Sequence, residues 1–209
     1  LGGRLGGLVG TLPSTIVPAS LGIFAGTVAT SSDPASANRA FAEAMGAVPV
    51  GMLLNALFLL LWRVLPPRLP AWRLRVRLAA MVVLTMTLWT LAAVAVVLGL
   101  GAVRPQALLV GAAASVIMLV IGVAACRNSV PAPAARRTVG GGTLLARGLL
   151  AAAAVAVSVA IAEAGAQTAA GVASVFPAIF LTTMVSLWLS QGEAVPAGAV
   201  GPMMLGSTA

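Results

Sequence analysis

The sequence is short of the residues on which most enzymes and metal sites depend. It contains no histidine and a single cysteine, Cys126. The commonest general base and metal ligand is therefore missing, and neither an intrachain disulfide nor a thiolate metal cluster can form. No pairing of a nucleophile with a base is visible along the chain. We expect no catalytic activity, no bound metal and no cofactor.

Charged side chains are scarce as well. An ordinary soluble domain carries about 25% charged residues. Here 8% are charged, 60% are hydrophobic and the mean hydropathy is +1.09. Apolar stretches of about 20 residues recur, each long enough to cross about 30 Å of hydrocarbon as a helix. Their continuity contradicts the alternating pattern of a membrane β-barrel. The sequence predicts an all-α, polytopic transmembrane helix bundle whose main partner is the lipid bilayer.

The few charges are strongly unbalanced. The net charge is +8 because the chain carries 12 arginines and no lysine against four carboxylates, Asp33, Glu43, Glu163 and Glu193. In a soluble protein this balance would suggest nucleic acid as a partner. Nine of the arginines cluster in two segments between apolar runs, five within residues 63–77 and four within 126–148. Clusters of this kind set membrane orientation, so we expect no nucleic-acid partner.

Seven apolar segments are predicted. They cover residues 5–28, 44–62, 78–100, 107–125, 149–162, 168–189 and the residues from about 194 onward. Residues 29–39, rich in Ser, Asn and Pro, are expected to form a surface loop, and residues 163–167 a tight turn. Pro13 and Pro177 lie inside the first and sixth segments, where proline removes an amide donor and breaks or kinks a helix.

A sequence pattern occurs twice. In each copy a glycine precedes a proline by six residues and a Glu-Ala pair precedes another glycine by eight residues. The paired positions are Gly7/Pro13 with Glu43/Gly51, and Gly171/Pro177 with Glu193/Gly201. Chance similarity is the alternative, because Gly, Ala, Val and Pro are abundant. The agreement of both spacings favours an internal repeat.

The arginine clusters predict that the two copies are oppositely oriented. Positive loops stay in the cytoplasm, which places the N-terminus inside and makes segments one and six run in opposite directions. An inverted repeat of five plus five helices follows, with four helices and the basic loop in residues 1–148, the fifth helix at 149–162 and the second repeat beginning in 163–209. Because the chain starts at Leu1 and stops within an apolar run, we expect a piece of a longer protein of about ten helices.

Three groups of residues are candidates for a solute or ion site. Glu43, Glu193 and Glu163 are carboxylates in or near hydrocarbon, which are costly there and often mark an ion pathway. The alternative is that Glu43 and Glu193 favour helix N-termini and that Glu163 is a turn residue. The prolines of the broken helices and nearby hydroxyls complete the set: Pro13, Pro177, Thr11, Thr15, Ser174 and Thr182. Such hydroxyls also bond to their own helix or to neighbouring helices.

Residues 171–181, GVASVFPAIFL, carry a Gly-to-Phe-Pro motif, and residues 7–17 are a looser match with Leu12 in place of the phenylalanine. This motif resembles that of small bacterial inner-membrane proteins of the GlpM-like group. The resemblance covers about a tenth of the chain. It implies a fused, duplicated relative in a bacterial cytoplasmic membrane, and it assigns no residue a role.

Two functions remain open from the sequence. Inverted repeats with interrupted helices are typical of secondary transporters, whose sites lie near the membrane midplane. The first hypothesis is thus a transporter or permease of a small solute, proton or cation, acting as a single copy or a homo-oligomer. The alternative is a membrane scaffold or assembly factor packed through Gly and Ala faces.

Overall fold

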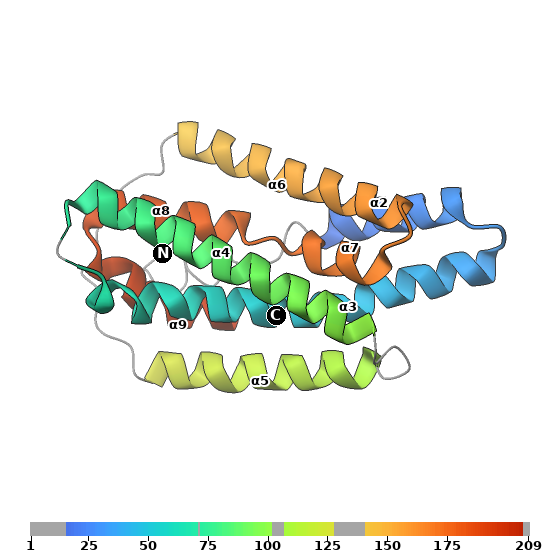
Figure 1. Cartoon of the computed structure of the whole chain (residues 1–209), viewed down its shortest axis with the longest axis horizontal. Coiled ribbons are helices and arrows are strands. Elements are labelled where there is room, and N and C mark those ends of the chain that lie inside the picture. The colour runs from blue at the N-terminus through green and yellow to red at the C-terminus, as the bar shows by residue number, and fades with distance from the viewer. Residues whose placement is uncertain (1–15, 71, 102–106, 128–140, 207–209) are drawn as a thin grey trace.

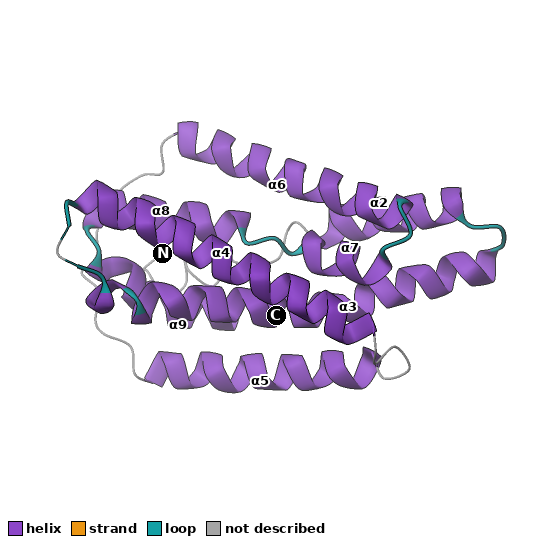
Figure 2. Ribbon diagram, in the orientation of Figure 1, coloured by secondary structure: helices purple, strands orange, loops and turns teal. Residues whose placement is uncertain are grey.

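The described part of the chain is almost entirely helical. The computed structural model describes residues 16–70, 72–101, 107–127 and 141–206, and no strand occurs within these ranges (Figure 2). The prediction of an all-α helix bundle is therefore confirmed. Pro13, Thr11 and Thr15, together with the first copy of the Gly-to-Pro spacing, lie outside the described residues.

The helices in the described part of the chain form seven apolar segments, as predicted. They are α2 Ile16–Thr30, α3 Pro34–Val64, α4 Leu74–Gly101, α5 Ala107–Arg127, α6 Gly141–Glu163, α7 Gln167–Ser174, α8 Ala178–Gln191 and α9 Ala194–Gly206, with a short 3₁₀ helix at Pro66–Arg68. Within the described residues, five spans are long and apolar enough to cross a membrane, and the pair α7–α8 counts as one of them. Two shorter apolar helices, α2 and α9, complete the seven.

Helix α3 is the central element of the bundle. It contacts α2, α4, α5, α7 and α9, whereas α6 lies at the periphery against α2, α7 and α8 (Figure 1). Its C-terminal half carries the main core, in which Phe58 and Trp62 are buried with Trp188 of α8. The rings of Trp62 and Trp188 meet edge to face at 5.9 Å. Burial of α3 on most sides explains why its sequence is apolar without a clear stripe.

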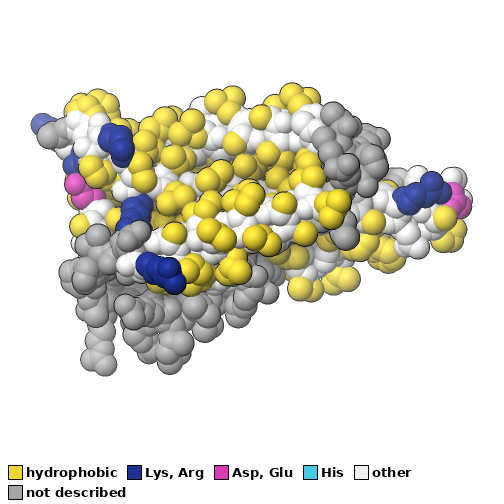
Figure 3. Space-filling view, turned by 90° about the horizontal axis from the view of Figure 1, so that it is seen from below, with side chains coloured by type: hydrophobic (Ala, Val, Ile, Leu, Met, Phe, Trp, Pro, Cys, Tyr) yellow, Lys and Arg dark blue, Asp and Glu magenta, His cyan; other side chains and the backbone are white. Residues whose placement is uncertain are grey.

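The outward surfaces of α4, α5 and α6 are apolar. Large side chains such as Leu98, Leu109 and Leu149 are more than 60% exposed, and a space-filling view shows a broad hydrophobic band with charged groups gathered at its two ends (Figure 3). Exposed apolar area on this scale requires an apolar solvent. The chain is an integral membrane protein.

The arginines of the two predicted clusters that the structure describes lie toward one end of the bundle. We call it the basic end and define it by Arg63, Arg73, Arg77 and Arg127. The connector between α2 and α3 and the turn between α6 and α7 lie at the opposite end (Figure 1). The positive-inside rule predicts that the basic end faces the cytoplasm.

The predicted surface loop over residues 29–39 is wrong. Helix α2 continues to Thr30 and α3 begins at Pro34, so that only three residues connect them. Asp33 is the N-cap of α3, and its carboxylate accepts hydrogen bonds from the amides of Ala35 (2.8 Å) and Ser36 (2.9 Å). Asp followed by Pro is a helix-start signal, since the acid caps free amides and proline suits the first helical position. Because residues 29–39 are mostly polar, their composition predicted a loop in place of this helix start.

The cap of α3 gives a pH-dependent prediction. Hydrogen bonds from the amide and hydroxyl of Ser36 are the main reason that the pKa of Asp33 lies below its ordinary value. The stabilisation of α3 by the ionised Asp33 cap is therefore present above the unfolded-state pKa and is lost as the pH falls through the lower folded-state pKa.

Substitutions of Asp33 test the cap. We expect Asp33→Ala to speed amide exchange of residues 35–40. Asp33→Asn, which caps equally well, should not, and equal exchange in both variants would contradict the capping role.

Two charged residues lie in other elements than the sequence predicts. Helix α6 begins at Gly141, so Arg147 belongs to a helix and not to the basic loop. Glu43 is inside α3 and not at a helix start. The turn after Glu163 is confirmed, with Gly165 at a φ of 83° that favours glycine.

Candidate functional site

The sixth apolar segment is interrupted where the sequence predicts. Helix α7 ends at Ser174, and α8 begins at Ala178 with Pro177 as its N-cap residue. Proline lacks an amide hydrogen and its ring clashes with the preceding turn, so the chain leaves the helical path over residues 175–177. Backbone groups freed inside a membrane must find partners within the protein. The identity of those partners defines the candidate site.

Asn55 of α3 supplies the partner at this break. Its side-chain amide Nδ2 donates to the carbonyl oxygen of Val175 at 2.6 Å, and its Oδ1 accepts from the indole Nε1 of Trp89 at 3.0 Å. Asn55 is 2% exposed. The Trp89 ring also meets Phe176 edge to face, with centroids 5.4 Å apart. Helices α3 and α4 thereby hold the break through one buried amide and one indole.

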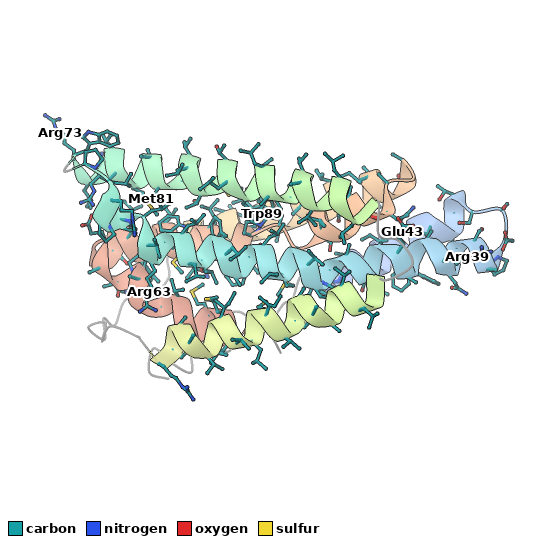
Figure 4. All side chains as sticks on the ribbon, turned by 60° about the horizontal axis from the view of Figure 1, so that its bottom comes forward. Arg39, Glu43, Arg63, Arg73, Met81 and Trp89 are labelled. Carbon is teal, nitrogen blue, oxygen red and sulfur yellow. The ribbon has the colours of Figure 1, made fainter. Side chains whose placement is uncertain are left out.

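The break lies near the middle of the membrane span. A helix rises about 1.5 Å per residue, so Glu43 and Arg63 are about 30 Å apart along α3, close to the thickness of the hydrocarbon core. On the same scale Asn55 is about 18 Å from Glu43 and about 12 Å from Arg63. Trp89 lies between Glu43 and Arg63 along the long axis (Figure 4). A buried polar group at this depth is costly unless it is paired.

Two glycines of the repeated pattern bring α3 and α7 into close contact beside the break. A Cβ atom on Gly171 would overlap the carbonyl oxygen of Ala44, and a Cβ on Gly51 would overlap the side chain of Val175. Small residues at helix crossings allow this approach. Gly201 of α9 is the counterpart of Gly51 in the second copy, and a Cβ there would lie 2.9 Å from the backbone nitrogen of Cys126 on α5. These glycines of the pattern are thus explained by packing.

Glu43 and Glu193 are not brought together. Glu43 is half-buried toward the end opposite the basic end (Figure 4), and its Oε1 accepts from the hydroxyl of Thr168 at 2.8 Å. Glu193 precedes α9 at the basic end and forms an ion pair with Arg77 at 2.7 Å. The helix-start placement predicted for Glu43 is wrong, and that for Glu193 is correct. Glu163 ends α6 and is exposed, as expected of a turn residue.

The described hydroxyls of the candidate set bond to their own helices. Ser174 donates to the carbonyl of Gly171 at 2.7 Å, and Thr182 donates to that of Ala178 at 2.8 Å. This is the packing alternative weighed from the sequence. Thr183, one residue further, differs because its hydroxyl oxygen also accepts from Arg147 of α6 at 2.7 Å.

Sequence reasoning did not select Asn55 and Trp89. The signal for Asn55 is a single amide inside an otherwise apolar run, and Trp89 stands in the middle of its span and not in an interfacial belt. Each is individually ordinary in a membrane helix, and their connection to Val175 appears only in the fold. No family model, curated protein or solved structure matches this chain.

Proposed function

We propose that the chain is part of a secondary transporter that moves a small solute or ion, with its site beside the break between α7 and α8. The observation that carries this proposal is the interruption of a membrane span near its middle, bridged by Asn55 and Trp89. Transporters place substrate and ion sites at discontinuous helices near the midplane. At the break the regular helical hydrogen bonds are replaced by two local backbone bonds, Phe176 N to Ala173 O and Ala178 N to Phe176 O, and by the Asn55 side chain. A helix interrupted in this way can change angle there more easily than a continuous one.

The directions of the helices support an inverted repeat. Helix α2 begins three residues after Pro13 and α8 begins one residue after Pro177. The two helices run in opposite directions along the bundle (Figure 1). Helices α3 and α9, which follow them, also run oppositely and contact each other. A pseudo-two-fold axis in the membrane plane would exchange α2 with α8 and α3 with α9.

The rival function is a membrane scaffold or assembly factor. One observation favours it: the polar groups that would line a path already have structural partners. Glu193 is ion-paired with Arg77, Glu43 accepts from Thr168, and Ser174 and Thr182 bond to their own helices. In a transporter, these contacts would have to exchange during the cycle.

Solute flux in the unmodified chain separates the two functions, and Glu193→Gln tests whether this carboxylate takes part in transport. If Glu193 carries a proton or binds a cation, we expect solute-coupled ion flux to fall at least about ten-fold. The folded protein should lose about 1 kcal/mol, because the Glu193 side chain is 38% exposed and glutamine keeps an oxygen that can accept a hydrogen bond from Arg77, whose side chain is 15% exposed.

Flux would be measured in proteoliposomes with an internal pH dye and a panel of small solutes. Asp33→Asn is the matched control, since it removes an exposed carboxylate outside the apolar spans. Flux that is unchanged in Glu193→Gln would contradict a role for this carboxylate. The absence of flux for every solute in the unmodified chain would favour the scaffold.

A further inference from the structure

Arg147 lies on a membrane-spanning helix and points into the bundle. It belongs to the span Leu145–Glu163 of α6, where Leu145 and Leu149 are more than 60% exposed. The Arg147 side chain is half-buried, and its Nη2 donates to the hydroxyl of Thr183 on α8 at 2.7 Å. Thr183 is eight residues before the end of α8, or about 12 Å inside it. The guanidinium is therefore directed between α6 and α8 and not outward to the aqueous edge.

No side-chain carboxylate of the chain neutralises this arginine. The sequence contains four, and the structure describes all of them. Asp33 caps α3, Glu43 accepts from Thr168, Glu163 is exposed at the far end of α6, and Glu193 pairs with Arg77. None lies within ion-pair distance of Arg147, since Arg77–Glu193 is the one ion pair among the described residues.

The hydrogen-bonding capacity of Arg147 is also incompletely used. Its Nε is buried and has no partner among the described residues. A guanidinium has five N–H donors in a planar fork that matches the paired oxygens of a carboxylate or phosphate. Near the edge of a bilayer, arginine ordinarily extends its head group to water. An arginine that instead turns inward, without a counter-charge and with a buried donor to spare, can hold an anion between the helices.

We propose that Arg147 is a binding site for an oxyanionic group, a carboxylate or phosphate held between α6 and α8 beside Thr183. Two sources share this chemistry, a small soluble anion and the head group of an anionic phospholipid. The site itself does not depend on transport. The chemical class of the transported solute does rest on the proposed function. If a soluble anion binds, the transported solute belongs to the class of small organic acids or phosphates.

The test is thermal unfolding of the purified chain in a neutral detergent, followed by tryptophan fluorescence. The soluble probes are sodium phosphate, acetate and succinate, compared with sodium chloride at equal ionic strength. The lipid probe is phosphatidylglycerol, compared with phosphatidylcholine. The variants are Arg147→Gln and Arg147→Met, with Arg127→Gln as the matched control because Arg127 is an exposed arginine at the end of α5.

We expect at least one oxyanion to raise the melting temperature of the unmodified chain and of Arg127→Gln. The apparent Kd should increase at least about ten-fold in Arg147→Gln, since charge-assisted hydrogen bonds are lost. Without ligand, Arg147→Met should melt no lower than the unmodified chain, because it removes an uncompensated charge. Phosphate or carboxylate as the active probe assigns a soluble ligand, and phosphatidylglycerol alone assigns a lipid.

The proposal is overturned if no oxyanion raises the melting temperature above chloride, or if Arg147→Gln keeps the full response. These results are distinguishable from failure of the transporter. Binding without any solute flux would contradict transport and leave the site intact. Flux of an uncharged solute that survives in Arg147→Gln would contradict only the anionic class of the solute.

Discussion

Gly171→Ala is expected to destabilise the bundle by about 3 kcal/mol, near the upper end of the usual effect of overpacking a core. The added Cβ would overlap the carbonyl oxygen of Ala44 and lie 3.0 Å from the Cβ of Ala47, both on α3. Because the first obstacle is backbone, no rotamer change relieves it, and α7 must move away from α3. That movement would also displace Val175 from Asn55. The measurement is reversible unfolding in mixed micelles with increasing denaturing detergent.

Gly99→Ala is the matched control for this prediction. Gly99 is in α4, and a Cβ there would meet nothing within 4 Å. Since alanine is a better helix former than glycine by up to about 1 kcal/mol, the control should be neutral or slightly stabilising. Similar stabilities for Gly171→Ala and Gly99→Ala would show that α3 and α7 are not in close contact at Gly171.

Asn55→Leu is expected to destabilise the chain by about 2 kcal/mol or more. The substitution leaves the Val175 carbonyl and the Trp89 indole N–H without their buried partner, and each unpaired group costs about 1–3 kcal/mol. Hydrogen bonds in membrane proteins average only about 0.6 kcal/mol. We expect the larger figure here because both groups are buried and one is a carbonyl freed by the break. The same unfolding assay measures it.

A double-mutant cycle with Trp89→Phe isolates the shared hydrogen bond. Phenylalanine keeps an aromatic ring against Phe176 but removes the indole donor. If the two residues act together, the double variant should lose about 1 kcal/mol less than the sum of the single losses. Additive losses would show that Asn55 and Trp89 contribute independently, which would contradict their joint role in holding the break.

Much of the fold follows from local sequence. Seven apolar segments are predictable because a membrane-spanning helix needs about 20 apolar residues, which leaves a clear length signal. The break at Pro177 is predictable because proline removes a backbone donor. The helical start at Pro34 is equally local, but the Asp-Pro signal lay among polar residues that also suit a loop.

The candidate site could not be predicted in the same way. Asn55 and Val175 are 120 residues apart in the sequence, and Arg77 and Glu193 are 116 apart. No periodicity or motif connects such positions, so their partners appear only when the helices pack. The carboxylates stood out in the sequence because charge is rare in apolar segments. In the structure, the residues that form the candidate sites are Asn55, a neutral amide, and Arg147. The inward direction of the Arg147 side chain cannot be read from composition.

The sidedness of the two repeat copies is the measurement that decides whether they are inverted. Ser32 precedes α3 and Ala194 begins α9, and both residues are exposed. In a Cys126→Ser background, single cysteines at these positions would be treated with a membrane-impermeant thiol reagent in intact cells and in inverted vesicles. We predict that Ser32→Cys reacts only from outside and Ala194→Cys only from inside. Reaction of both cysteines from the same side would contradict the inverted arrangement, and with it the proposed transporter.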